Sequence, residues 1–246
     1  MTISPVSDKL YAAPQRQVAP FEFDEAVVAV FPDMIERSVP GYTLLLPLIG
    51  QIASRYAQPH SRCYDLGCSL GAVTLALRQQ IQQPGVRITA VDNSPAMIET
   101  CGQIIGRSGP GLPVDLVEAD ICQTAVRNAS VVVLNFTFQF VPPTQRDALI
   151  QRIYDGLLPG GALILSEKVV FEPAELDDLL VTLHHDFKRA NGYSDLEISQ
   201  KRTALENVLI SETVPQHQAR LRQAGFASAD LWFQAFNFVS LLAVKG

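Results

Sequence analysis

The stretch CYDLGCSLGAVTLAL, residues 63–77, constrains the fold of this chain more than any other segment. An apolar run ends at Asp65, Gly67 and Gly71 follow, and apolar residues then recur at helical spacing. This order predicts a strand, a tight turn and the start of a helix. A chain organised around such a unit is expected to be an α/β protein in which ligands collect at the carboxyl ends of parallel strands.

Strand and helix patterns alternate along much of the remaining chain. Strands are expected at 62–66, 87–92, 114–118, 129–135 and 161–168, and helices at 70–82, 95–107 and 144–157. This alternation predicts βαβ units and a mostly parallel sheet. Two late strands, 226–233 and 236–244, are separated by a couple of residues and should pair antiparallel.

The segments outside this alternation are mainly helical. Residues 1–20 are polar and read as an arm, and residues 21–41 as short helical turns joined by breakers such as Pro32. A helix is expected at 42–56, with a probable kink at Pro47. We therefore expect one domain over 1–246, with an N-terminal helical cap at 21–57.

A helical insertion is expected at 173–210. Its first helix, 173–190, ends at Asn191-Gly192, and its second begins at Ser194-Asp195-Leu196-Glu197, which fits a capping box. A further helix is expected at 215–224.

Composition excludes several classes of protein. Hydrophobic residues make up 48% of the 246 residues, enough for a large core, while the net charge of −6 argues against direct nucleic-acid binding. The four cysteines form no C-x-x-C pair, which predicts reduced thiols in a cytoplasmic protein and no metal site. The N-terminus lacks a secretory signal, and no apolar run is long enough to cross a membrane.

The glycine turn excludes some ligands by its sequence. A triphosphate loop needs a lysine after its last glycine, whereas Gly71 is followed by Ala72 and Val73. The dinucleotide fingerprint needs a glycine where this chain has Ser69, so NAD is disfavoured.

Carboxylates after the next two strands suggest a nucleoside instead. Asp92 ends the second strand, where an acidic side chain accepts hydrogen bonds from both ribose hydroxyls. Asp120 follows the third strand and could accept from an adenine amine, with Ile121 covering the base. Asp92 with Asn93-Ser94-Pro95 could equally cap the next helix, and paired glycines occur in many α/β turns.

Taken in order, these features resemble the class I S-adenosylmethionine-dependent methyltransferases over residues 60–246. This similarity implies a Rossmann-like, mostly parallel seven-stranded sheet with an antiparallel last strand. Longer segments, among them GYTLLLPLIG, YDLGCSLGA, AVDNSPAMI, SEKVVF and NGYSDLEISQKRTALENVL, resemble the carboxy-S-adenosyl-L-methionine synthases over nearly the whole chain. No assigned motif departs from that family's pattern.

The closer resemblance implies a reaction and a set of contacts. The family makes carboxy-S-adenosyl-L-methionine and phenylpyruvate from S-adenosyl-L-methionine and prephenate, without a metal, and a separate enzyme uses the product to modify wobble uridine in tRNA. A homodimer is also implied. The implied ligand contacts are Tyr42, Gly67, Cys68, Ser69, Asp92, Asn93, Asp120, Ile121, Asn135 and Arg202, the last holding the product carboxylate.

Two segments bear on this chemistry independently. Asn135-Phe136-Thr137-Phe138-Gln139-Phe140 places aromatic residues after the fourth strand, either to line a dry pocket or to pack the sheet edge. Arg202 falls on one helical stripe with Ile198, Leu205 and Leu209, whereas Lys201 is expected to pair with Glu197 on the outer face. From pattern alone, Arg202 could bind a ligand carboxylate, pair with a protein carboxylate or reach solvent.

Other functions stay open at this level. The main alternative is an ordinary small-molecule methyltransferase on the same fold, and a third is a non-catalytic S-adenosylmethionine-binding subunit of a tRNA-modifying system. Arg37, Arg55 and Arg189 are available as prephenate contacts, but the sequence does not choose among them. The histidines receive no role.

Overall fold

A seven-stranded sheet forms the centre of the computed structural model, which describes residues 6–246. The strands are β1 (Arg62–Leu66), β2 (Arg87–Asp92), β3 (Val114–Glu118), β4 (Ala129–Asn135), β5 (Leu157–Lys168), β6 (Ser228–Ala235) and β7 (Phe238–Val244). Their order is β3-β2-β1-β4-β5-β7-β6. The pairs among β1 to β5 are parallel, and β7 runs antiparallel to both β5 and β6, as the sequence predicted.

Helices accompany the strands in the expected order. They are α1 (Glu25–Ser38), α2 (Tyr42–Tyr56), α3 (Ala72–Gln80), α4 (Pro95–Arg107), α5 (Pro143–Gly156), α6 (Ala174–Ala190), α7 (Asp195–Leu205) and α8 (Val214–Ala224), with a 3₁₀ turn η1 at Phe138–Phe140. Strand and helix ends differ from the sequence-based ranges by a few residues; β5, for example, begins at Leu157 instead of 161.

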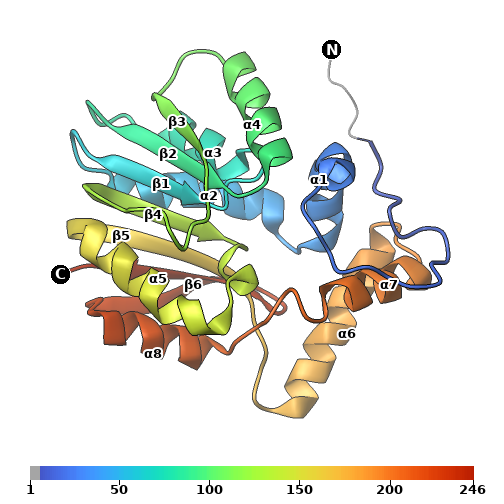
Figure 1. The fold of residues 1–246 in the computed structure, drawn as a ribbon. Coiled ribbons are helices and arrows are strands. Elements are labelled where there is room, and N and C mark those ends of the chain that lie inside the picture. Colours follow the sequence, from blue (N-terminus) through green and yellow to red (C-terminus); the bar gives the residue numbers. More distant parts are fainter. Residues whose placement is uncertain (1–5) are drawn as a thin grey trace.

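The sheet is covered on both faces (Figure 1). Helices α5 and α8 pack one face, where Ile150 and Leu221 join a fully buried cluster with Leu134. Helices α2 and α3 pack the other face, where Leu45 and Leu77 join Ile88 and Val131. Strands buried on both sides read as continuous apolar runs, which explains why β4 was recognisable as ASVVVLN.

Helix α4 packs against β2 and β3, whereas helices α1, α6 and α7 gather beyond one end of the sheet (Figure 1). They lie over the carboxyl ends of the strands, where α1 contacts α4 and α6, and α6 contacts α7. The residues expected as an N-terminal cap, 21–57, thus take two positions, because α1 joins this group while α2 packs against α3.

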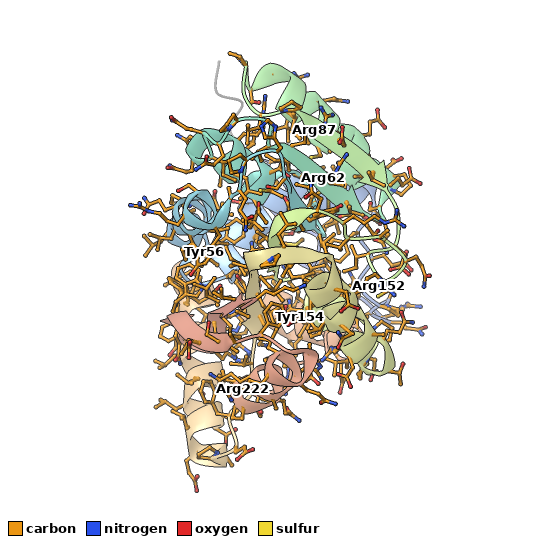
Figure 2. The ribbon with its side chains drawn as sticks, turned by 90° about the vertical axis from the view of Figure 1, so that its left-hand side faces the viewer. Tyr56, Arg62, Arg87, Arg152, Tyr154 and Arg222 are labelled. Atoms are coloured by element: carbon orange, nitrogen blue, oxygen red, sulfur yellow. The ribbon has the colours of Figure 1, made fainter. Side chains whose placement is uncertain are left out.

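The opposite end of the sheet, where the strands begin, faces the viewer in Figure 2. Arg62 and Arg87, labelled there, start β1 and β2, and both form ion pairs with Asp115, at 2.9 Å and 2.5 Å. These two arginines therefore have a protein carboxylate as their shared partner.

The expectation for residues 21–41 was wrong. They form one helix, α1, capped by the Asp24 side chain, which accepts from the Val27 amide at 2.9 Å, and the helix continues through Pro32. An interior proline costs about 3 kcal/mol. That cost is offset by burial, because Val30 and Met34 pack into a cluster with other apolar side chains.

The expected arm is held in place over its described part, residues 6–20. The Asp8 carboxylate is buried and accepts a hydrogen bond of 2.6 Å from the Tyr193 hydroxyl. The Gln200 amide donates to the carbonyls of Tyr11 and Ala13 at 2.8 Å and 2.9 Å. The arm therefore covers α7, and residues 1–5 of that prediction lie outside the described residues.

Candidate functional site

A cavity of about 790 Å³ lies between the carboxyl ends of the strands and helices α1, α6 and α7. Its walls include every residue that the family resemblance implied as a ligand contact: Tyr42, Gly67, Cys68, Ser69, Asp92, Asn93, Asp120, Ile121, Asn135 and Arg202. These residues come from widely separated parts of the chain, and the fold brings all of them to one place.

The turn after β1 is shaped by its glycines. Gly67 and Gly71 have φ of +82° and +84°, and Ser69 between them has φ of +49°. A Cβ on Gly67 would overlap the Thr137 side chain, so only glycine fits there. The amides of Gly67 and Cys68 both donate to the Val91 carbonyl, which ties the turn to β2.

Asp92 joins the turn to the next helix. Its Oδ2 accepts from the Ser69 amide and its Oδ1 from the Ser94 amide, both at 2.9 Å. Ser94, not Asp92, caps α4, because its side chain accepts from the Met97 amide. Asp92 therefore shapes the turn, and lone pairs on its carboxylate remain for a ligand. Burial raises the pKa of Asp92.

A second carboxyl group lies deeper in the same wall. Asp65, in β1, is fully buried, and the Thr74 hydroxyl donates to its Oδ2 at 2.6 Å. Burial is the main reason that the pKa of Asp65 is raised to about 7, and the nearby charge of Asp92 contributes to this increase.

The part of the cavity beside β3 is more open. Asp120 is exposed, and its Oδ1 accepts from the Cys122 amide at 2.8 Å. Ile121 is only 8% exposed and contributes to both the core and the cavity wall. A flat base lying here would meet an acceptor at its edge and an apolar side chain on its face.

The end of β4 supplies an amide and aromatic rings. Asn135 Oδ1 is buried and has no hydrogen-bond partner among residues 6–246. Phe136 and Phe140 line the cavity, with Phe136 packed against Tyr42 at 6.4 Å between ring centroids. Phe138 instead lies in the core with no exposed surface, so the two interpretations of this aromatic segment each apply to part of it.

Helix α7 turns the predicted stripe toward the cavity, since Ile198, Arg202, Leu205 and Leu209 all line it. The helix ends at Leu205, so Leu209 lies beyond it, and Lys201 and Ala204 are buried as well. Arg202 is exposed and lines the rim of the cavity. Within the described chain, no carboxylate forms an ion pair with Arg202, so pairing with a protein carboxylate is not observed.

The predicted ion pair of Lys201 with Glu197 on the outer face of α7 was wrong. Glu197 completes the capping box with Ser194, which confirms that part of the prediction. Lys201 is buried, with its Nζ 3.4 Å from Ser38 Oγ and 4.0 Å from Asp8 Oδ2. The N-terminal arm packs against α7 and so buries the Lys201 side chain. Helical periodicity alone does not predict this contact.

The arginines considered for an anionic substrate lie elsewhere. Arg37 pairs with Asp33 at 2.6 Å, and Arg189 pairs with Asp186 and Asp195. Arg55 borders a separate shallow pocket on the outer side of α2 and α3. None of these arginines is among the described residues that line the central cavity.

The structure adds lysines and histidines that sequence analysis missed. Lys168, His184, His185, Lys188 and Lys201 all line the cavity, and burial lowers the pKa of both histidines, which favours their neutral form. Lys168 ends β5, a place where ligand-binding residues gather in such sheets, and His184 and Lys188 are one helical turn apart in α6. The strand end at Lys168 and the helical spacing of His184 and Lys188 could both be found in the sequence.

Across residues 6–246, no cluster of side chains suits a metal ion, and no helix is long and apolar enough to cross a bilayer.

Comparison with known proteins gives close relatives. A model of a methyltransferase domain matches residues 64–161. A protein from Trichlorobacter lovleyi named carboxy-S-adenosyl-L-methionine synthase is 63% identical over 240 residues, 97% of this chain and 98% of that protein. A protein of the same name from Aeromonas hydrophila is 63% identical over 238 residues, 97% of this chain and 96% of that protein.

Solved structures confirm the fold. Human N-acetylserotonin methyltransferase in complex with SAM superposes with a TM-score of 0.61 at 19% identity, covering 91% of this chain and 57% of that one. A putative S-adenosyl-L-methionine-dependent methyltransferase from Methanococcus maripaludis superposes with a TM-score of 0.60 at 22% identity, covering 94% of this chain and 97% of that one. The expected class I fold is therefore present.

Proposed function

Because the chain belongs to the carboxy-S-adenosyl-L-methionine synthases, a family of transferases, we propose that it converts S-adenosyl-L-methionine and prephenate to carboxy-S-adenosyl-L-methionine and phenylpyruvate. The observation that carries the proposal is the exposed guanidinium of Arg202 on the rim of a cavity that also contains Asp92 and Asp120. A nucleoside and a carboxylate could be held in this cavity at the same time.

The residues present suit the adenosyl ligand. Asp92 accepts from the ribose hydroxyls and Asp120 from the adenine amine, while Ile121 covers the base. The turn at Gly67, Cys68 and Ser69 takes the amino-acid end through backbone contacts. The buried Asn135 Oδ1, which lacks a protein partner within residues 6–246, offers an acceptor for a ligand donor.

Arg202 is suited to the carboxylate that distinguishes the product. A planar guanidinium donates two parallel hydrogen bonds to a carboxylate. In this chain the side chain meets no ion-pair partner among the described residues, and it faces the cavity. We assign it the product carboxylate, as the family resemblance implies.

The proposed reaction balances without a protein base. Prephenate loses carbon dioxide and a hydroxide-equivalent to become phenylpyruvate, and the hydroxide-equivalent takes a proton from the sulfonium methyl group to form water. The resulting ylide carbon then forms a bond to the carbon dioxide. The residues of this chain need to orient the substrates and exclude water, to which Phe136 and Phe140 in the wall contribute.

The remaining parts of the proposal concern partners. The product would supply the carboxymethyl donor for tRNA wobble uridine modification by a separate enzyme, and the net charge of −6 supports a role without direct tRNA binding. A homodimer in the cytoplasm, with no membrane association, completes this proposal.

Mass spectrometry tests the proposed function. Ligand released from the denatured protein should include a nucleoside heavier than S-adenosyl-L-methionine by one carboxylate. The purified chain should also form this compound only when prephenate is present. Methylation of a small-molecule acceptor without prephenate would instead establish an ordinary methyltransferase, and absence of any turnover would favour a binding subunit.

A further inference from the structure

Lysine side chains from different elements line the central cavity. Lys168 ends β5, Lys188 lies on α6, and Lys201 lies on α7. All of them line the cavity, and Lys188 and Lys201 are only 8% and 7% exposed. The fold thus places several amines from different elements around one space.

The order of the strands shows where this space lies along a bound ligand. Adjacent strands are about 4.8 Å apart, so β3, which precedes Asp120, and β5, which ends at Lys168, are about 19 Å apart in the order β3-β2-β1-β4-β5. The turn after β1, which would take the amino-acid end, is about 10 Å from β5. Lys168 therefore lies beyond the place expected for the adenosyl ligand, where a second substrate would bind, and Lys188 is close enough to Lys168 to be affected by its charge.

These cations influence one another. Burial, followed by the charges of Lys201 and Lys168, lowers the pKa of Lys188 to about 7. Burial, followed by the charge of Arg202, lowers the pKa of Lys168. The amines and the guanidinium thus form one mutually repelling group.

Protein carboxylates neutralise this group only in part. Lys201 lies 4.0 Å from Asp8, and Asp177 acts on Lys168 from the start of α6 without forming an ion pair. Lys168 and Lys188 form no ion pair with any carboxylate in the part of the chain described here. At the other end of the sheet, by contrast, Arg62 and Arg87 share Asp115 (Figure 2).

Buried like charges without counter-ions are unfavourable unless an anion joins them. We propose that Lys168 and Lys188 form a carboxylate-binding subsite that holds an anionic co-substrate next to the sulfonium end of the adenosyl ligand. This inference rests on the proposed function and assigns residues to its second substrate.

The subsite takes the carboxylate that the co-substrate keeps. In the proposed reaction one carboxylate of prephenate leaves as carbon dioxide and reappears on the product, beside Arg202. The pyruvyl carboxylate stays on phenylpyruvate throughout, so a fixed pair of amines can hold it from substrate to product. Arg202 and the lysine pair would therefore act on different carboxylates.

Steady-state kinetics of Lys168→Met and Lys188→Met test this assignment. Methionine keeps an unbranched chain of similar length and removes the charge. We expect the KM for prephenate to rise about 10- to 100-fold, as for loss of a charged hydrogen bond, while the KM for S-adenosyl-L-methionine changes less than about threefold. Lys188→Arg should recover part of the loss. Lys9→Met, at an exposed position outside the cavity, is the matched control and should behave as wild type.

The outcomes separate this inference from the proposed function. If the wild type turns over prephenate and both variants keep its KM, the subsite is wrong and the function stands. If the wild type does not use prephenate, the proposed function fails, and calorimetric titration of malonate into the S-adenosylhomocysteine complex then tests the subsite. Tighter binding to wild type than to Lys188→Met by about tenfold supports the subsite, and equal affinity overturns it.

Discussion

Replacing Arg202 by lysine separates charge from geometry at the rim of the cavity. Arg202→Lys keeps a positive charge but removes the planar pair of donors that a carboxylate accepts. Because Arg202 is exposed and pairs with no carboxylate of the described chain, the free energy of unfolding should change by less than about 0.5 kcal/mol. A change in ligand binding can then be attributed to the missing donors.

The expected magnitude follows from the number of hydrogen bonds lost. One charged hydrogen bond contributes about 1.5–3 kcal/mol, which corresponds to about a 10- to 150-fold change in affinity. The dissociation constant for carboxy-S-adenosyl-L-methionine should increase by this factor. That for S-adenosyl-L-methionine, which lacks the carboxylate, should stay within about threefold of wild type.

Isothermal titration with both ligands measures these constants directly. Arg189→Lys is a suitable control, since Arg189 is also an arginine of the insertion but pairs with Asp186 and Asp195 outside the cavity. Equal affinity of wild type and Arg202→Lys for the carboxylated ligand would refute the assignment of Arg202. An equal loss for both ligands would place Arg202 on the shared methionine portion instead.

Four variants, Lys188→Met among them, test other parts of the site. Asp92→Asn should weaken S-adenosyl-L-methionine binding by about 10- to 100-fold in calorimetry, because both Asp92 oxygens accept from backbone amides and the new NH₂ group replaces one of these acceptors. Asp120→Asn should cost less than about tenfold, because Asp120 is exposed and only the Cys122 amide donates to it. Gly67→Ala should lower the free energy of unfolding in urea by at least about 1–3 kcal/mol, because φ is +82° and the new Cβ meets Thr137; an unchanged midpoint would contradict this. The pKa of Lys188 is lowered from 10.5 to about 7 in the folded protein, mainly by burial. Between pH 7 and pH 10.5 the unfolded chain therefore binds a proton at Lys188 that the folded chain does not, so the free energy of unfolding rises with pH. Wild type should gain up to about 1.4 kcal/mol per pH unit relative to Lys188→Met in phosphate-free urea titrations, and parallel pH profiles would exclude the shift.

The strand and helix pattern was predictable because it is local. An apolar run such as ASVVVLN at β4, or the glycine turn after β1, carries its structure within a few residues. The same locality made the Asp92 and Asp120 positions recognisable, since each follows a strand whose carboxyl end faces the ligand side of the sheet.

The burial of Lys201 on α7 was not predictable in this way. The predicted stripe of Ile198, Arg202 and Leu205 does line the cavity. Lys201 is buried because the N-terminal arm, which lies far from α7 in the sequence, packs against this helix. The Asp8 carboxylate, nearly two hundred positions earlier in the chain, accepts a hydrogen bond from the Tyr193 hydroxyl and lies 4.0 Å from the Lys201 amine. Because Asp8 is far from Lys201 in the sequence, the sequence alone makes Lys201 resemble an ordinary surface lysine.

The α1 helix illustrates a related limit. Pro32 correctly signals a cost to helix continuity, but the cluster that contains Val30 and Met34 is assembled from α4, α7 and the arm. Packing between segments far apart in sequence decides such cases, and neither propensity nor periodicity contains that information.

The cation group around Lys168 and Lys188 implies that the two substrates assist each other in binding. The sulfonium of S-adenosyl-L-methionine is itself a cation. At about 10 Å, the spacing between the turn after β1 and β5, and with an effective dielectric constant of about 20, protonated Lys168 opposes it by about 1.7 kcal/mol. An anion that neutralises the lysines removes that repulsion, so each ligand should tighten the other reciprocally. Saturating phenylpyruvate, which carries a carboxylate but cannot react, should therefore lower the dissociation constant of S-adenosyl-L-methionine by about tenfold. The control is S-adenosylhomocysteine, an uncharged thioether of nearly the same shape, whose affinity should change little. Equal tightening of both nucleosides would show that phenylpyruvate acts by packing or closure instead of charge, and no tightening of either would mean that the lysines do not oppose the sulfonium.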